Sequence, residues 1–378
     1  MRHCVYFAPG MFGFGRIGAF DYFTHLEEAI RGQLEQAGHE VDTFVVDVSP
    51  TASIRRRAGC LAELVHDTAC EEGPIHLVGH STGGLDARLV ASPSAKLPGR
   101  TKPPSWLPRL RSVTTMNTPH YGTPLATFFA TKSGQSVLYA LSALTFIALT
   151  VGAPPMAIAS ALVVGLGRVD ITLGVQIRAI ERVTDRLLAI LEPAQSQEVR
   201  EYLEAIKFDQ GAVIQLTPEA MDLFQAGVED RAGVRYQSVV ALAPAPTAGR
   251  VVKNALAPWR MVSQALFTAL YGLTARYDER YPCAAPSLES EVERRLHRAF
   301  GRLPGVRAND GVVPVLSQIW GEVVWTGHAD HLDVLGHFPD DTSPEALHVD
   351  WLTSGSAFTR RDFDAMTCAM AAGMLAAP

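Results

Sequence analysis

The sequence has little cysteine and no long run of basic residues. Its five cysteines are scattered, odd in number and never spaced as CxxC: Cys4, Cys60, Cys70, Cys283 and Cys368. This argues against a disulfide framework and against a zinc site, which both need paired or clustered thiols. No stretch of Lys and Arg is long enough to follow a phosphate backbone, and the formal net charge is −6. We therefore expect no nucleic-acid partner.

Recognisable targeting and membrane-spanning patterns are also missing. The N-terminus lacks the charged, apolar and small-residue zones of a secretory signal, and residues 4–8 already have the pattern of a core strand. We expect a cytoplasmic protein, unless a leader was removed before this numbering begins. The charge-free stretch 133–167 is interrupted by Gly152-Ala153-Pro154-Pro155. Each of the two pieces is too short to cross a bilayer, so a helical hairpin is the better interpretation.

The apolar residues are arranged for an α/β fold. The chain has 378 residues, of which 47% are hydrophobic and 19% charged, enough for a sizeable core. Alternating strand and helix patterns in the first third indicate a mostly parallel sheet with crossover helices on both faces. We predict strands at 4–8, 41–48, 75–78, 112–116, 234–242 and 322–325, and helices at 23–37, from Ser53 to about Cys70, from about Gly84, and at 361–375.

The segment Gly79-His80-Ser81-Thr82-Gly83 fits the pattern G-x-S-x-G. A predicted strand enters it and a predicted helix leaves it, which is the context of a nucleophile elbow. In so sharp a turn Ser81 takes a strained backbone conformation, and Gly79 and Gly83 avoid a collision because they lack Cβ. The helix N-terminus favours negative charge developing at the serine. A glycine-rich turn with an incidental serine is the alternative that this context disfavours.

A serine nucleophile needs a base and an acid that orients the base. In this kind of fold they follow the serine in the order acid, then histidine. Asp310 lies in the turn 309–314, and His331 lies in a loop just after the last predicted strand, between two acids. The competing bases are His328, His337 and His348, and the competing acids are Asp330 and Asp333. These two acids are so near His331 along the chain that a good hydrogen bond to its Nδ1 is harder to form.

The same chemistry needs two backbone N–H groups that stabilise the oxyanion. One is expected from Thr82, the residue after the nucleophile. The other is expected from Met11, which follows Gly10 in the loop after the first strand. The alternative for this loop is a flexible glycine-rich connection without a catalytic role.

Five segments together resemble the bacterial triacylglycerol lipases of family I, which are calcium-dependent members of the α/β-hydrolase superfamily. They occur in the order of that family, with comparable spacing through the first 125 residues and between Asp310 and His331. Residues 130–215 and 246–305 do not match by eye. The matching segments are Gly10-Met11-Phe12-Gly13-Phe14 with Asp21-Tyr22, residues 79–84, residues 117–123, Asn309-Asp310-Gly311, and His331-Leu332-Asp333.

The resemblance implies an α/β-hydrolase fold with Ser81, Asp310 and His331 as the catalytic triad. It implies Met11 and Thr82 as oxyanion donors, Arg57 as a brace for the oxyanion loop, and Asp333 as a calcium ligand. The chain departs from the family in two places. Pro9 stands where the family usually has His, although the backbone donor one residue beyond Gly10 can survive this change. The second calcium aspartate has no clear counterpart, so no cofactor is expected to be required and any calcium would be structural.

The predicted organisation has three parts. Residues 1–125 form the N-terminal part of the core, residues 126–230 a helical lid or cap, and residues 231–378 the C-terminal part, with an insertion at 246–305. The apolar stretch 133–167 suits a mobile lid or a segment lying on a lipid surface, and a fixed buried cap is the alternative. We expect a lipase or carboxylesterase acting on an ester or lipid substrate. A phospholipase, a polyester hydrolase, an acyltransferase and an inactive lipid-binding module remain as alternatives, and the oligomeric state stays open.

Overall fold

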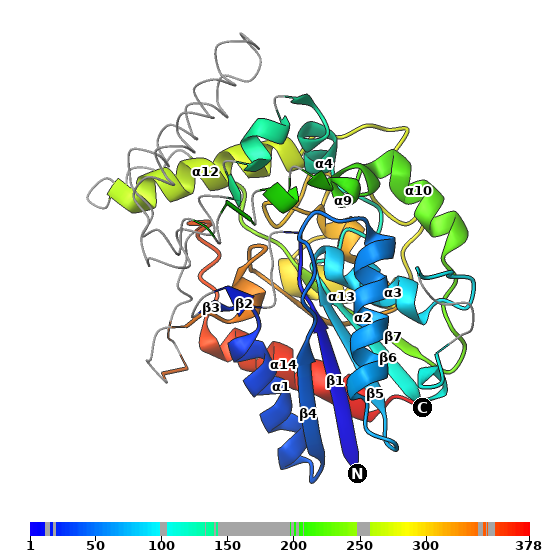
Figure 1. Ribbon diagram of the computed structural model, residues 1–378. Helices are drawn as coiled ribbons and strands as arrows, with labels where there is room; N and C mark the ends of the chain where they lie inside the picture. The colour runs from blue at the N-terminus through cyan, green and yellow to red at the C-terminus, as the bar shows by residue number, and fades with distance from the viewer. Residues whose placement is uncertain are drawn as a thin grey trace.

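The computed structural model describes residues 1–11, 16–17, 20–98, 104–132, 134–139, 141–142, 197, 200–201, 204–206, 208–247, 258–338, 343–344, 346 and 352–378. Six strands form one sheet in the order β4-β1-β5-β6-β7-β8, and every neighbouring pair is parallel (Figure 1). Their bounds are β1 Arg2–Ala8, β4 Glu40–Val45, β5 Ile75–His80, β6 Leu110–Met116, β7 Arg235–Ala241 and β8 Glu322–Gly327. A two-stranded antiparallel ribbon, β2 (Arg16–Ile17) and β3 (Phe20–Asp21), follows β1.

Helices cover both faces of the sheet. On one face α1 (Thr24–Gln36) packs against α14 (Arg360–Leu375), and on the other α2 (Ile54–Thr68) packs against α3 (Thr82–Ala91) (Figure 1). Strand β1 shows why both faces need cover. Val5 and Phe7 enter the core under α1 and α14, whereas Cys4, Tyr6 and Ala8 enter the core under α2 and α3. A strand buried on both faces is typical of a parallel sheet in an α/β protein.

Local sequence signals set the helix ends. Gly38 adopts φ +85° just after α1 and so provides the left-handed residue that ends many helices. The Ser53 side chain accepts a hydrogen bond from the Arg56 N–H and caps α2, in agreement with the helix predicted from this residue. The predicted strand 41–48 ends earlier, at Val45, although the Val46 N–H still donates to the Phe7 carbonyl oxygen of β1 at 3.0 Å.

Further helices lie beyond the carboxyl ends of the strands (Figure 1). They are α4 (Pro124–Phe129), α9 (Gly211–Gln215), α10 (Pro218–Gly227) and α12 (Pro258–Thr274), and they share a separate apolar cluster with Met11 and Leu85. Helix α13 (Ser290–Phe300) packs instead against β8. The short 3-10 helices are η1 (Leu107–Arg109), η2 (Val315–Gln318) and η3 (Asp333–Leu335). The four helices α4, α9, α10 and α12 therefore cover the edge of the sheet at which the strands end.

Most of the predicted lid lies outside the described residues. Of the stretch 133–167, the structure describes 134–139 and 141–142. The roles of this stretch as a lid or as a lipid-surface segment stay predictions. Within the part of the chain that is described, no helix combines the length and apolar character needed to span a membrane.

Candidate active site

Ser81 is the single residue that links β5 to α3. Its backbone has φ +54° and ψ −125°, a strained conformation for a residue with a side chain. A Cβ at Gly79 would lie 2.3 Å from the Gly83 backbone, and a Cβ at Gly83 would lie 2.0 Å from the Ala8 carbonyl oxygen. Both positions therefore require glycine. The turn is tighter than the sequence indicated, since the helix begins at Thr82 and not near Gly84.

His331 lies between Ser81 and Asp310. Its Nε2 is 3.0 Å from Ser81 Oγ and its Nδ1 is 2.8 Å from Asp310 Oδ2. All three side chains are buried, with Ser81 retaining 7% exposure. In the tautomer that satisfies both contacts, Nδ1–H donates to the carboxylate and Nε2 accepts from the serine hydroxyl. The structure thus brings together the three residues that the sequence proposed as nucleophile, base and acid.

Five donors surround the Asp310 carboxylate. Oδ1 accepts from the backbone N–H groups of Val312 and Val313, at 2.9 and 2.7 Å. Oδ2 accepts from Asn117 Nδ2 at 2.8 Å and from Gln318 Nε2 at 3.2 Å, in addition to His331. These bonds fix the orientation of the acid toward the imidazole. Sequence reasoning did not assign a role to Asn117 or Gln318, although Asn117 directly follows β6 and so lies at the edge where the site forms.

The rival residues have other partners. His328 is exposed and its Nδ1 lies 3.2 Å from the Leu242 carbonyl oxygen, and His337 packs edge-on against His25. His348 lies outside the described residues. Asp330 Oδ1 accepts from the N–H groups of Leu332 and Asp333, and Asp333 Oδ2 accepts from the Asp330 N–H. Both acids stabilise the turn that carries His331, while Asp310 contacts its imidazole.

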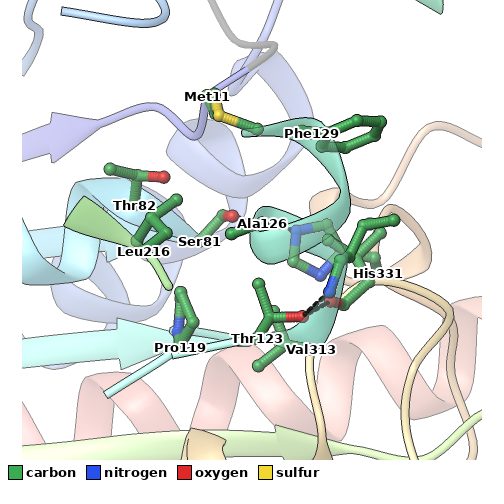
Figure 2. A pocket seen from close by; sticks show the side chains of 12 residues that line it. Met11, Ser81, Thr82, Pro119, Thr123, Ala126, Phe129, Leu216, Val313 and His331 are labelled. Carbon is green, nitrogen blue, oxygen red and sulfur yellow. Dashed lines mark hydrogen bonds between the residues drawn. The ribbon is translucent and has the colours of Figure 1, made fainter. Parts of the chain in front are cut away.

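The loop after β1 lies directly against the elbow. A Cβ at Gly10 would be 2.8 Å from the Ser81 Cβ, so this close approach requires glycine. Met11 and Thr82 line the same pocket as Ser81 (Figure 2). The two residues expected to supply oxyanion N–H groups therefore both border the pocket at the nucleophile.

Arg57 ties this loop to the core. Its Nη2 donates to the Pro9 carbonyl oxygen, and its Nη1 donates to the Pro50 carbonyl oxygen at 3.2 Å. Its Nε donates to Asp86 Oδ2 at 2.8 Å, in an ion pair with side-chain exposures of 0% and 1%. Burial raises the pKa of Asp86 to about 7, although the Arg57 charge opposes this shift. These contacts give Arg57 the bracing position that the resemblance implied.

The pocket beside Ser81 is mostly apolar. It holds about 360 Å³ of empty space, part of which is open to solvent. In Figure 2, Met11 and Phe129 lie on one side of Ser81, and Pro119 and Thr123 on the other. Helix α4 contributes three of the lining side chains, and the loop that carries Asp310 contributes two more. The full lining is Met11, Ser81, Thr82, Pro119, Thr123, Leu125, Ala126, Phe129, Leu216, Val312, Val313 and His331.

Asp333, the predicted calcium ligand, is buried, and its Oδ2 accepts hydrogen bonds from the Asp330 N–H and, at 2.6 Å, from Ser356 Oγ. Calcium takes six to eight oxygen ligands. The role of Asp333 as a calcium ligand stays a prediction. Among the residues that the structure describes, no group of three or more His, Cys, Asp or Glu side chains is arranged to hold a metal ion.

All these groups converge at one edge of the sheet. Met11 follows β1, Ser81 follows β5, Asn117 follows β6 and His331 follows β8. Ligand and catalytic sites of parallel α/β sheets form at this carboxyl edge. The strained serine elbow, with its histidine and acid, defines the class as an α/β-hydrolase fold.

The chain is similar in sequence to a known lipase over part of its length and in fold to solved lipase and esterase structures. The chain is 30% identical to the triacylglycerol lipase of Pseudomonas fragi over 148 residues, which are 37% of this chain and 44% of that lipase. The match therefore spans less than half of the relative. No family model matches the sequence. EstA from Clostridium botulinum has a TM-score of 0.49 at 17% identity, covering 96% of this chain and 87% of its own. The Staphylococcus hyicus lipase has a TM-score of 0.48 at 15% identity, and the match covers 99% of this chain and 96% of that lipase.

Proposed function

We propose that this protein is a serine hydrolase that cleaves carboxylic esters, of the lipase or carboxylesterase type. The observation that carries the proposal is the pair of contacts made by His331, to Ser81 Oγ at 3.0 Å and to Asp310 Oδ2 at 2.8 Å. A buried serine has no need of such an arrangement for stability, and its strained backbone costs free energy. The arrangement is the one that converts a serine hydroxyl into a nucleophile.

The reaction follows from these positions. Ser81 Oγ attacks the ester carbonyl carbon while His331 Nε2 takes the hydroxyl proton, and Asp310 stabilises the imidazolium that forms. The negative charge on the former carbonyl oxygen is stabilised by the N–H groups of Met11 and Thr82. The tetrahedral intermediate collapses, the C–O bond to the alcohol breaks, and His331 protonates the leaving alkoxide. Water then attacks the acyl-enzyme in the same way and releases the acid.

The pocket indicates the acyl side of the substrate. Apolar side chains from α4, from the C-cap of α9 and from the Asp310 loop surround the nucleophile, among them Leu125, Phe129, Leu216 and Val312. Such a surface binds a hydrocarbon chain by removing it from water. Together with the similarity to a triacylglycerol lipase, this supports acyl glycerols and other lipid esters as the substrate class.

The first prediction concerns the nucleophile. Ser81→Ala should lower kcat for p-nitrophenyl esters by about 10⁴ to 10⁶, because the triad acts as a unit. Assays on acyl chains from acetate to palmitate would also give the chain-length preference. A fluorophosphonate probe should label the intact protein at Ser81.

The control for this prediction is Ser92→Ala. Ser92 is a buried serine at the other end of α3, and its side chain contacts Ser94 and not the pocket. This variant should keep its activity. Absence of turnover on every ester and of labelling in the intact protein would contradict the proposal and favour a lipid-binding module.

A further inference from the structure

His80, the residue before the nucleophile, is fully buried but has no role in the mechanism above. Its side chain lies between two groups. Nδ1 is 2.7 Å from Tyr22 Oη, and Nε2 is 2.8 Å from the backbone carbonyl oxygen of His331. Its ring centroid is 4.8 Å from that of His331. The His80 imidazole thus connects Tyr22 to the backbone of the catalytic base His331.

The partners of His80 determine where its proton lies. The His331 carbonyl oxygen can only accept, so His80 Nε2 carries the hydrogen. In the neutral ring Nδ1 is then an acceptor, and the Tyr22 hydroxyl donates to it. Burial lowers the pKa of His80 well below its ordinary value, and the nearby His331 lowers it further. His80 is therefore a neutral imidazole with one defined tautomer.

This bond completes the support of His331. Its backbone N–H donates to the Asp310 carbonyl oxygen at 3.0 Å, and its carbonyl oxygen accepts from His80. Its ring is held between Ser81 and Asp310. Because both backbone polar groups of His331 are fixed, the position of its Cα relative to Ser81 is fixed as well. Removal of the His80 bond would release one side of this support.

Tyr22 and His80 also lie next to the oxyanion loop, which contains Gly10 and Met11. A Cβ at Gly10 would lie 3.3 Å from Tyr22 Oη and 3.4 Å from His80 Nδ1. Tyr22 is 6% exposed and belongs to the segment that follows this loop in the chain. The hydrogen-bonded chain Tyr22–His80–His331 therefore joins a side chain packed beside Gly10 of the oxyanion loop to the backbone of the base.

We infer that His80 and Tyr22 are positioning residues that set the placement of the His331 imidazole relative to Ser81 Oγ and to the oxyanion loop. This inference rests on the proposed ester hydrolysis and deepens it. Neither residue contacts the reacting atoms. Their contribution is to hold the base in register before substrate binds, where a displacement of about 1 Å can cost about 100-fold in rate. A neutral His80 also places no positive charge beside the imidazolium that His331 becomes.

The test compares two replacements at the same position. His80→Leu fills the space of the imidazole with an apolar side chain and removes both hydrogen bonds. This variant should lower kcat for a p-nitrophenyl ester about 100-fold and change KM less than about threefold. His80→Gln offers an amide N–H to the His331 carbonyl and an oxygen to the Tyr22 hydroxyl. It should recover most of the lost kcat. A role in packing alone would not separate Leu from Gln in this way.

The matched control is His76, a buried histidine at the other end of the same strand, whose ring contacts His3 and Ser112. His76→Leu should leave kcat within about twofold, even though it removes buried hydrogen bonds. This comparison separates positioning of the base from a general loss of stability in β5.

Tyr22→Phe supplies a second measurement if His80→Leu does not fold, because it removes one oxygen atom. It should lower kcat about tenfold. An unchanged kcat in Tyr22→Phe, or equal losses in His80→Leu and His80→Gln, would overturn the inference. If the intact protein hydrolyses no ester, the proposed function fails instead, and the two failures are distinct.

Discussion

At the scale of the residue, the Asp310 carboxylate has the most strictly defined surroundings in the site. Its two oxygens accept from two backbone N–H groups, two side-chain amides and the imidazole of His331. Every one of these partners is a donor, so the position requires a group that only accepts. Asp333 is nearer to His331 along the chain, but the imidazole Nδ1 contacts Asp310. Proximity in the sequence therefore does not determine which acid orients the base.

Asp310→Asn tests this requirement. The amide is close in size but donates where the site needs an acceptor, so His331 would be held in the wrong tautomer. We expect kcat to fall by about 10³ to 10⁴, with a smaller change in KM, in steady-state assays on a soluble ester. Asp333→Asn, which changes an acid in the same turn, should reduce stability more than kcat. Equal kcat in Asp310→Asn and the intact protein would remove Asp310 from the mechanism.

At the scale of the element, Arg57 joins α2 to α3 and to the loop after β1. It pairs with Asp86 of α3 and donates to the carbonyl oxygens of Pro9 and Pro50. Since this pair is buried, its loss is more serious than that of a surface ion pair, because the remaining charge has no solvent. The position of the oxyanion loop thus depends on packing between two helices as well as on its own glycines.

Arg57→Leu should therefore destabilise the fold by about 3 to 5 kcal/mol in urea denaturation. Asp86 would be left buried without its cation, and its pKa would rise further above the present value of about 7. A carboxyl with a raised folded-state pKa stabilises the fold below its unfolded pKa, and that stabilisation is lost as pH rises through the folded pKa. Below about pH 7 the Asp86 carboxyl is protonated in both folded proteins, so the loss in this variant should grow as pH rises above about 7, where only the intact protein stabilises the ionised form.

The double variant Arg57→Leu/Asp86→Leu provides the control, because it removes both charges. It should recover much of the stability and lose the added pH dependence. A double variant no more stable than the single one would show that the bonds to Pro9 and Pro50, and not the unpaired acid, dominate the loss.

At the scale of the whole molecule, several buried histidines couple folding to pH. Burial lowers the pKa of His76 to about 3 and that of His3 to about 4, and it lowers the pKa of His80 and His120 well below the ordinary value. A histidine with a lowered folded-state pKa binds a proton more readily when unfolded. Its contribution to stability is complete above pH 6.5 and is lost as pH falls from there toward the folded-state value.

We expect the free energy of unfolding to fall as pH is lowered from 7.5 to 5.0. For His76 alone the loss at pH 5 is about 2 kcal/mol, since the unfolded residue is then protonated and the folded one is not. Urea denaturation at the two pH values measures it. His76→Leu should show a smaller difference between the two values by that amount, and an unchanged difference would contradict the prediction.

Local sequence patterns determined much of the fold. Strand and helix alternation, the Ser53 cap and Gly38 placed β1, α1, α2 and β5 within a few residues, because these signals act over one turn or one strand. The pattern G-x-S-x-G identified the elbow because its residues are contiguous, and Gly79 is required by its contact with Gly83 in the same turn. Gly83 is required by a contact with Ala8 of the neighbouring strand β1, which the short pattern does not contain. The order of serine, acid and histidine along the chain, together with the resemblance to bacterial lipases, identified Asp310 as the candidate acid and His331 as the candidate base.

Only the tertiary structure decided which distant groups meet. Asn117 and Gln318 converge on Asp310 from different elements, and the Tyr22–His80–His331 chain joins three segments, two of them about 250 residues apart. The sheet order brings the ends of β1, β5, β6 and β8 to one edge, and no local pattern encodes that pairing. The hydrogen bond from Ser356 Oγ to Asp333 Oδ2 likewise joins two segments of the chain that no local pattern brings together. Such contacts arise from packing of the whole chain, so their physical cause lies beyond the reach of a short sequence window.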